Sequence, residues 1–111
     1  MSKLTIGVIF GSRSAEHDIS IVTAIASIIK PLEMSGKYNV VAIYIDKQGK
    51  WYSHPKLKEI SLYTSGQIDN FLLKLSPLEL RMGGKLELVS AGSLGKRKVQ
   101  SIDVAFPATH G

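Results

Sequence analysis

Residues 7–20 read GVIFGSRSAEHDIS, and this stretch predicts how the rest of the chain folds. The apolar run 4–10 is rich in β-branched residues and stops at Gly11, which is typical of a strand buried on both faces. Small residues then predict a tight turn, and Ser12 or Ser14 is a suitable N-cap for a following helix. Because ligands of open α/β sheets bind at the carboxyl ends of the strands, we expect the functional site at this turn.

A helix and two further buried strands are expected after the turn. Residues 38–45 and 102–106 are apolar runs of the same kind as the first strand. Gly7, inside the first strand, indicates that another backbone passes close by. Pro31 lacks the N–H that a helix interior needs, so we expect a kink or break near Lys30. The helix itself is indicated by apolar residues at helical spacing: Ile21, Ile25, Ile28 and Leu32, with Val22 and Ile29 widening the stripe.

Residues 78–89 predict a β-hairpin at the periphery of this sheet. Apolar side chains alternate with polar ones on both sides of two glycines. A two-residue turn would mix the apolar and polar faces. A three-residue loop, 83–85, pairs Met82 with Leu86 and keeps the apolar residues on one face, so we predict that loop, with a glycine in the left-handed position.

Together these elements predict an α/β fold: a Rossmann-like three-layer domain with a mainly parallel sheet and a peripheral β-hairpin. The 111 residues are the size of one domain, so residues 1–111 are expected to form a single unit. Between the second strand and the hairpin, we expect helical turns at 56–60 and 67–75. The segments 46–50 and 61–66 are expected to be a turn and a loop.

The composition is that of an ordinary folded domain, with 44% apolar and 21% charged residues. The chain contains no cysteine, which excludes disulfides, thiolate zinc sites and cysteine nucleophiles within it. The apolar run near the N-terminus is too short for the core of a signal peptide or for a membrane span. We therefore expect a cytoplasmic protein.

The net charge of +5 raises the question of nucleic acid. The only dense basic run is 96–98, and no aromatic residues interleave with it as a stacking surface requires, so we interpret it as solvated loop charge. Residues 90–96 look superficially like a phosphate loop, but Ser90 and Arg97 both violate the Walker A pattern, and a flexible connection is predicted. Asp46 would suit a ribose contact, but the glycine motif of dinucleotide folds is absent after the first strand.

Two acidic residues, Glu16 and Asp18, fall in the first turn of the expected helix. The helix dipole keeps them ionised, and an ionised carboxylate at the rim of a cleft suits an ammonium group. Such residues also stabilise a helix N-terminus without any ligand, and the residues alone leave both interpretations open. His110 follows the third strand and is therefore expected on the same rim as Glu16, whereas His54, beside Pro55, is expected at the surface.

Two motifs resemble those of the D-alanine–D-alanine ligases. The sequence GSRSAEHDIS at 11–20, after a short apolar strand, is similar to the N-terminal motif of that family. The sequence FPATHG at 106–111 is similar to the start of the family's second signature. Ser12 and Thr109 stand where the family often has glycine and leucine, and neither position is among the expected substrate contacts.

The resemblance implies that the chain is the substrate-binding N-terminal domain, of pre-ATP-grasp type, of such a ligase. In the family, ATP phosphorylates the carboxylate of a first D-alanine, and the amine of a second attacks the acyl phosphate. Carried over by motif position, Glu16 holds the ammonium group of the first substrate and Ile19 supplies an apolar wall near its methyl group. His110 lies near the substrate carboxylate, which it orients or stabilises.

The resemblance also implies ATP and Mg²⁺ as cofactors, bound by an ATP-grasp region outside these 111 residues, so this chain alone is expected to be inactive. It implies peptidoglycan synthesis, cell shape, D-alanine as partner and a homodimer, with neither nucleic acid nor membrane bound. The second substrate, D-alanine or D-lactate, depends on residues beyond Gly111. The alternatives are a stand-alone, Rossmann-like small-molecule-binding or regulatory module, and a nucleic-acid-binding domain suggested only by charge.

Overall fold

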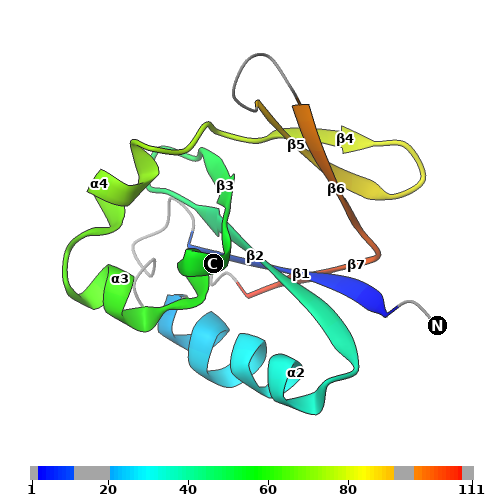
Figure 1. Cartoon of the computed structure of the whole chain (residues 1–111), viewed down its shortest axis with the longest axis horizontal. Helices are drawn as coiled ribbons and strands as arrows, with labels where there is room; N and C mark the ends of the chain where they lie inside the picture. Colours follow the sequence, from blue (N-terminus) through cyan, green and yellow to red (C-terminus); the bar gives the residue numbers. More distant parts are fainter. Residues whose placement is uncertain (1–2, 12–20, 92–96, 109–111) are drawn as a thin grey trace.

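A four-stranded sheet forms the centre of the fold (Figure 1). The computed structural model describes residues 3–11, 21–91 and 97–108. In spatial order, the strands are β3 (Trp51–Ser53), β2 (Tyr38–Ile45), β1 (Leu4–Gly11) and β7 (Val104–Pro107). The strands β2, β1 and β7 run parallel, and β3 is antiparallel to β2. The predicted mainly parallel sheet is therefore confirmed.

The segment between β1 and β2 is helical where it is described, and its turns change type. A π-helix, η1 (Thr23–Ile29), continues as an α-helix, α2 (Lys30–Ser35). The Lys30 N–H donates to the carbonyl of Ile25, five residues back. Pro31 lies in the first turn of α2, where its missing N–H is tolerated. The predicted break near Lys30 thus takes the form of a change from π to α turns.

One side of this helical segment packs on the sheet, as the apolar stripe predicts. Ile21, Ile25 and Ile29 are buried, and Ile28 and Leu32 are partly buried against the same core. The prediction that Val22 widens the stripe is wrong, because its side chain is 51% exposed. Each residue turns about 100° around a helix, so the neighbour of buried Ile21 points away from the sheet.

The predicted hairpin belongs to a second, antiparallel sheet of three strands, β4 (Glu79–Met82), β5 (Leu86–Ala91) and β6 (Arg97–Ile102). Met82 pairs with Leu86, and Gly84 has φ of 94°, so the three-residue loop and its left-handed glycine are confirmed. The interpretation of 96–98 as loop charge is wrong for Arg97 and Lys98, which lie in β6. This strand pairs with β5 through its backbone, and its residues 98–101 are exposed, so its side chains give no strand signal.

The third predicted strand, 102–106, is divided at Asp103. The N–H of Asp103 donates to the carbonyl of Thr5 at 2.9 Å, and the N–H of Thr5 donates to the Asp103 carboxylate at 2.8 Å. Lys85 forms an ion pair with the same carboxylate at 2.7 Å. These contacts fix the corner at which the chain passes from the second sheet to the first.

The strand after this corner is less buried than predicted. Val104 and Phe106 are 45% and 47% exposed, although the sequence predicts a strand covered on both faces. The cause is position: among the described residues, β7 is the last strand at its edge of the sheet.

The central sheet lies between two layers, which confirms the predicted three-layer architecture. The helical layer covers one face, over a core that includes Val8 and Phe10. The three-stranded sheet covers the other face through Ile43, Leu88 and Ile102. At Gly7, an added Cβ would lie 2.8 Å from Cδ1 of Ile43 and 3.0 Å from Cγ2 of Ile102. The close neighbours of this glycine are therefore side chains, not the backbone that the sequence suggested.

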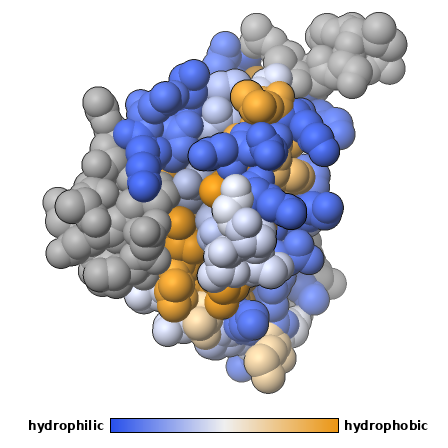
Figure 2. Space-filling view, turned by 90° about the vertical axis from the view of Figure 1, so that its left-hand side faces the viewer, coloured by the Kyte–Doolittle hydropathy of each residue, from blue (hydrophilic) through white to orange (hydrophobic). Residues whose placement is uncertain are grey.

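Three short helices connect β3 to β4: η2 (Pro55–Lys58), α3 (Ile60–Thr64) and α4 (Ile68–Leu72). The helical turns predicted at 56–60 and 67–75 are confirmed in part, whereas the loop predicted over 61–66 is wrong because α3 occupies most of it. Tyr63 of α3 is partly buried, and its hydroxyl donates to the carbonyl of Leu57 at 2.6 Å. Figure 2 shows the side that carries α3 and α4, where hydrophobic atoms surface as a narrow strip among hydrophilic ones.

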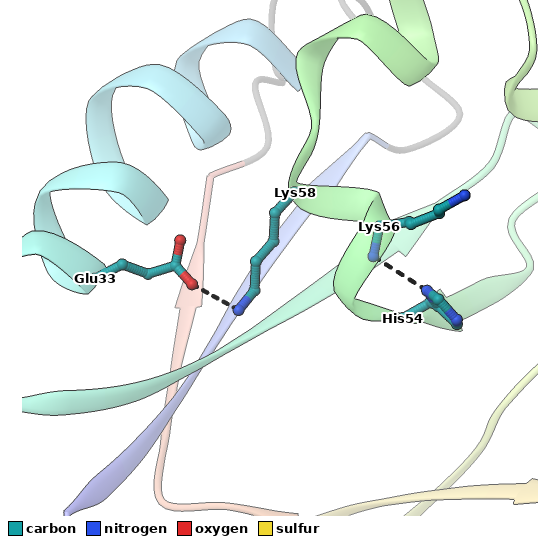
Figure 3. Close-up of polar contacts among 4 residues, drawn as sticks. All are labelled: Glu33, His54, Lys56 and Lys58. Atoms are coloured by element: carbon teal, nitrogen blue, oxygen red, sulfur yellow. Dashed lines mark hydrogen bonds and ion pairs between the residues drawn. The ribbon is translucent and has the colours of Figure 1, made fainter.

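Side-chain contacts fix the start of this helical stretch (Figure 3). Nδ1 of His54 accepts the N–H of Lys56 at 3.0 Å, and the Lys58 ammonium pairs with Glu33 of α2 at 2.7 Å. His54 lies at the surface as expected, although it is partly covered, with its ring centroid 5.0 Å from that of Phe71. Its role in the fold is to cap η2.

Candidate active site

The carboxyl ends of β1 and β7 lie side by side. Ile9 is in register with Pro107, and the N–H of Ala108 donates to the carbonyl of Ile9 at 2.7 Å. The chain therefore leaves β1 after Gly11 and leaves β7 after Ala108 at the same edge of the sheet. This is the edge at which ligands of open α/β sheets bind.

The predicted site residues follow these two strand ends. Glu16 and Ile19 belong to residues 12–20, and His110 belongs to residues 109–111, both of which lie outside the described residues. The structure thus brings together the strand ends from which the two motifs begin, and the proximity of the three side chains stays a prediction.

Gly11 ends β1 in a conformation that requires glycine. Its φ is 90°, a value that side chains rarely allow. A Cβ at this position would also overlap the carbonyl oxygen of Ile45 and approach the ring of Tyr44 at 3.0 Å. Residue 11 can therefore lie this close to the end of β2 only because it has no side chain.

A cavity of about 510 Å³ opens beside the carboxyl end of β2. Three tyrosines, from β2, β3 and α3, line it together with the 46–50 turn and α4. Asp46 holds that turn in shape, because its carboxylate accepts the N–H groups of Gln48 and Lys50 at 2.9 Å each. The described lining residues are Ile21, Tyr44, Asp46, Lys47, Gln48, Lys50, Tyr52, Tyr63, Ile68, Asp69, Leu72 and Leu73.

Two of these tyrosines have pKa values above the ordinary range. Burial raises the pKa of Tyr63, and the neighbouring Tyr44 raises it further. Burial also raises the pKa of Tyr52, with a smaller contribution from the Asp46 carboxylate. Both phenols are therefore protonated at neutral pH and bring no negative charge to the cavity, and the Tyr63 hydroxyl already donates to the Leu57 carbonyl.

The tyrosines were not identified as cavity residues from the sequence. Tyr44 lies in a predicted strand, and its pairing with Tyr52 across β2 and β3 brings the two tyrosines to one face. Tyr63 lies in α3, where a loop was expected. The available signal was the strand repeat of two residues, which places Tyr44 on the same face as Ala42 and opposite to Ile43.

A larger cavity, of about 1070 Å³, lies between the second sheet and the chain around His54. Its described lining includes Ser53, Lys74, Ser90 and Lys98, and no residue of β1 or β7. It is therefore separate from the edge at which the two motifs begin.

Within the described residues, no group of three or more His, Asp or Glu side chains is arranged to hold a metal ion. No helix among the described residues combines the length and the apolar character that a membrane span requires.

Comparison with known proteins identifies the family. The model of the D-ala D-ala ligase N-terminus matches residues 5–111. The chain belongs to the D-alanine–D-alanine ligase family. It corresponds to the N-terminal domain that this model describes. The chain spans about 28–30% of the length of the curated relatives that it matches.

Relatives in this family come from several bacteria. The chain is 34% identical to the D-alanine–D-alanine ligase of Thermosipho melanesiensis, over 97% of this chain and 28% of the relative. It is 32% identical to D-alanine–D-alanine ligase A of Escherichia coli K12, over 100% of this chain and 30% of the relative. The crystal structure of the Helicobacter pylori ligase matches 97% of this chain and 31% of its own, with a TM-score of 0.71 and 28% identity. The α/β fold described above is therefore that of the ligase N-terminal domain.

Proposed function

We propose that this chain binds the first D-alanine in a longer, ATP-dependent ligase that joins two D-alanines into D-alanyl-D-alanine for peptidoglycan synthesis. The observation that carries the proposal is the adjacency of the carboxyl ends of β1 and β7, since the two ligase motifs begin at these ends. The family match over residues 5–111 supports it.

In this proposal, each predicted residue recognises one part of the substrate. The carboxylate of Glu16 accepts charge-assisted hydrogen bonds from the substrate ammonium group, and Ile19 packs on the methyl group. His110 orients the substrate carboxylate and stabilises the charge on it as the acyl phosphate forms. The amine of the second substrate then attacks the acyl carbon, and phosphate leaves.

ATP and Mg²⁺ belong to the remainder of the enzyme in this proposal. The described part of the chain offers no cluster of metal ligands, and its sequence carries no Walker A motif. A homodimer and a cytoplasmic location are part of the same proposal by family membership. The choice between D-alanine and D-lactate as second substrate is assigned to residues beyond this domain.

The test is D-alanine-dependent ADP release by the protein that the whole reading frame encodes, with Glu16→Gln as the variant. We expect KM for the first D-alanine to rise roughly 10- to 100-fold, because a hydrogen bond to a charged group is worth about 1.5–3 kcal/mol. Glu59→Gln is the matched control, since Glu59 is exposed and its side chain caps no helix.

If KM is unchanged in Glu16→Gln, Glu16 does not bind the substrate and serves only to stabilise the helix N-terminus. The family assignment would not be affected. A complete protein without D-alanine-dependent turnover would instead favour the stand-alone binding module, for which the 510 Å³ cavity would be the candidate site.

A further inference from the structure

The second sheet forms one wall of the cavity of about 1070 Å³. Ser90 of β5 pairs with Lys98 of β6. Leu88 pairs with Gln100 two residues along, so all four side chains lie on one face of the sheet. Leu88 packs on Ile43 of the central sheet. This face is therefore apolar where it contacts the central sheet, and it carries a hydroxyl, an ammonium and an amide group where the cavity opens.

A second wall follows β3 and the chain that runs from α4 to β4 (Figure 1). It contributes the hydroxyls of Ser53 and Ser76 and the ammonium group of Lys74. The N–H of Leu78 donates to the carbonyl of Trp51 at 2.8 Å, which ties this part of the chain to β3. Backbone hydrogen bonds therefore hold both walls in place.

His54 brings a further hydrogen-bond donor to the lining of this cavity. Its Nδ1 accepts the N–H of Lys56 (Figure 3), so Nδ1 carries no hydrogen. A neutral imidazole then carries its hydrogen on the other ring nitrogen, which makes Nε2 a donor. No acceptor among the described residues takes this hydrogen, since the ring contacts only the Lys56 N–H and Phe71 there.

The charge of this lining has one sign. Lys74 and Lys98 form no ion pair with any described residue. None of the described lining residues is Asp or Glu. The smaller cavity beside β2 differs, because Asp46 and Asp69 accompany the lysines of its lining. The larger cavity is therefore the one whose charge attracts an anion.

We propose that the larger cavity binds an organic phosphate. A phosphate group carries about two negative charges at neutral pH and presents three acceptor oxygens, which suits two ammonium groups beside hydroxyls and an imidazole N–H. Leu75, Leu78 and Leu88 supply an apolar wall for the rest of the molecule. The inference does not rest on the proposed function, because no described residue of β1 or β7 lines this cavity.

The test measures the binding of 1-naphthyl phosphate to the protein that the whole reading frame encodes, by isothermal titration calorimetry. In the double variant Lys74→Gln, Lys98→Gln, we expect the dissociation constant to rise at least about tenfold, because charge-assisted hydrogen bonds are lost. The matched control is Lys30→Gln, Lys37→Gln. It removes the same charge from two exposed lysines that line neither cavity, and its effect should stay below about twofold.

A second measurement uses the wild-type protein and needs no variant. Its lysines are acetylated with and without 1-naphthyl phosphate, and the modified peptides are quantified by mass spectrometry. At a probe concentration of about ten times Kd, only about one site in eleven is empty, so acetylation of Lys74 and Lys98 should slow about tenfold. Lys30 and Lys37 should react at the same rate in both samples.

Equal dissociation constants in the two double variants would overturn the inference, because net charge alone would then matter. Binding that leaves Lys74 and Lys98 fully reactive would also overturn it, because the probe would then occupy another site. 1-Naphthol has the same rings without the phosphate, and equal affinity for it would contradict recognition of the anion. Inorganic phosphate that bound as tightly as the probe would contradict the role of the apolar wall. None of these measurements uses catalysis, so their failure leaves the proposed ligase function untouched.

Discussion

At the scale of single residues, Gly11 limits how the first motif can be built. Its positive φ and the carbonyl of Ile45 both exclude a side chain. We expect Gly11→Ala to destabilise the 111-residue chain by at least about 2 kcal/mol, measured by urea unfolding. The Gly66→Ala variant separates the two causes, because Gly66 has φ of 77° but no neighbouring atom within 4 Å of an added Cβ. If the two variants lost the same free energy of unfolding, the overlap with the carbonyl oxygen of Ile45 would contribute nothing to the loss at residue 11.

The same residue illustrates what the sequence can predict about the site. The glycine after an apolar run correctly marked the end of β1, and the turn expected after it stays a prediction. The contact with β2 that makes the glycine necessary depends on how the strands pair, which no local pattern contains. For Glu16, Ile19 and His110 the sequence predicts roles, and the structure tests only the strand ends that carry them.

At the scale of elements, Asp103 joins three of them: the hairpin loop, β1 and the start of β7. The hydrogen bond from Lys85 is the main cause that lowers the pKa of the Asp103 carboxyl, and the N–H of Thr5 lowers it further. A lowered folded-state pKa stabilises the fold above the unfolded pKa, and this contribution is lost as the pH falls through the folded pKa. We expect Asp103→Asn to unfold at lower urea concentration than the wild type at pH 7.

The difference should disappear in acid, below the pKa of Asp103 in the folded chain, because the wild-type carboxyl is then protonated as well. Lys85 sets the limit of the same ion pair at high pH. Its pKa is raised by the same contact, so its contribution is lost when the pH rises through that raised value. The control for Asp103→Asn is Glu79→Gln, which also removes one negative charge. Glu79 lies on exposed β4 and takes part in no ion pair that the structure assigns. If Asp103→Asn were still less stable than the wild type in acid, packing and not the carboxylate charge would stabilise the corner at residue 103.

The elements also show where sequence patterns succeed. Continuous apolar runs predicted β1 and β2, and alternation predicted the hairpin register, because in both cases burial selects the side chains. The strand β6 was missed because residues 98–101 are exposed and pair through backbone groups. The break at Asp103 had a local signal, since aspartate is disfavoured within strands.

At the scale of the whole molecule, two apolar cores share one sheet, so we expect them to unfold together. Leu88 anchors the second sheet on Ile43 and is 2% exposed, whereas Leu80, directly opposite it on β4, is 42% exposed. Leu88→Ala should destabilise the chain by about 2–4 kcal/mol, and Leu80→Ala by less than about 1 kcal/mol. Trp51 is the only tryptophan of the chain and packs on the Leu88 core, so its fluorescence reports this layer.

Far-UV circular dichroism reports both layers of the same molecule. If the central sheet couples them, the fluorescence and dichroism transitions of Leu88→Ala coincide and shift together relative to the wild type. A fluorescence transition at lower urea concentration than the dichroism transition would mean that the three-stranded sheet detaches first. The helical layer and the central sheet would then form the cooperative unit, and the edge at which the two ligase motifs begin would not depend on the second sheet.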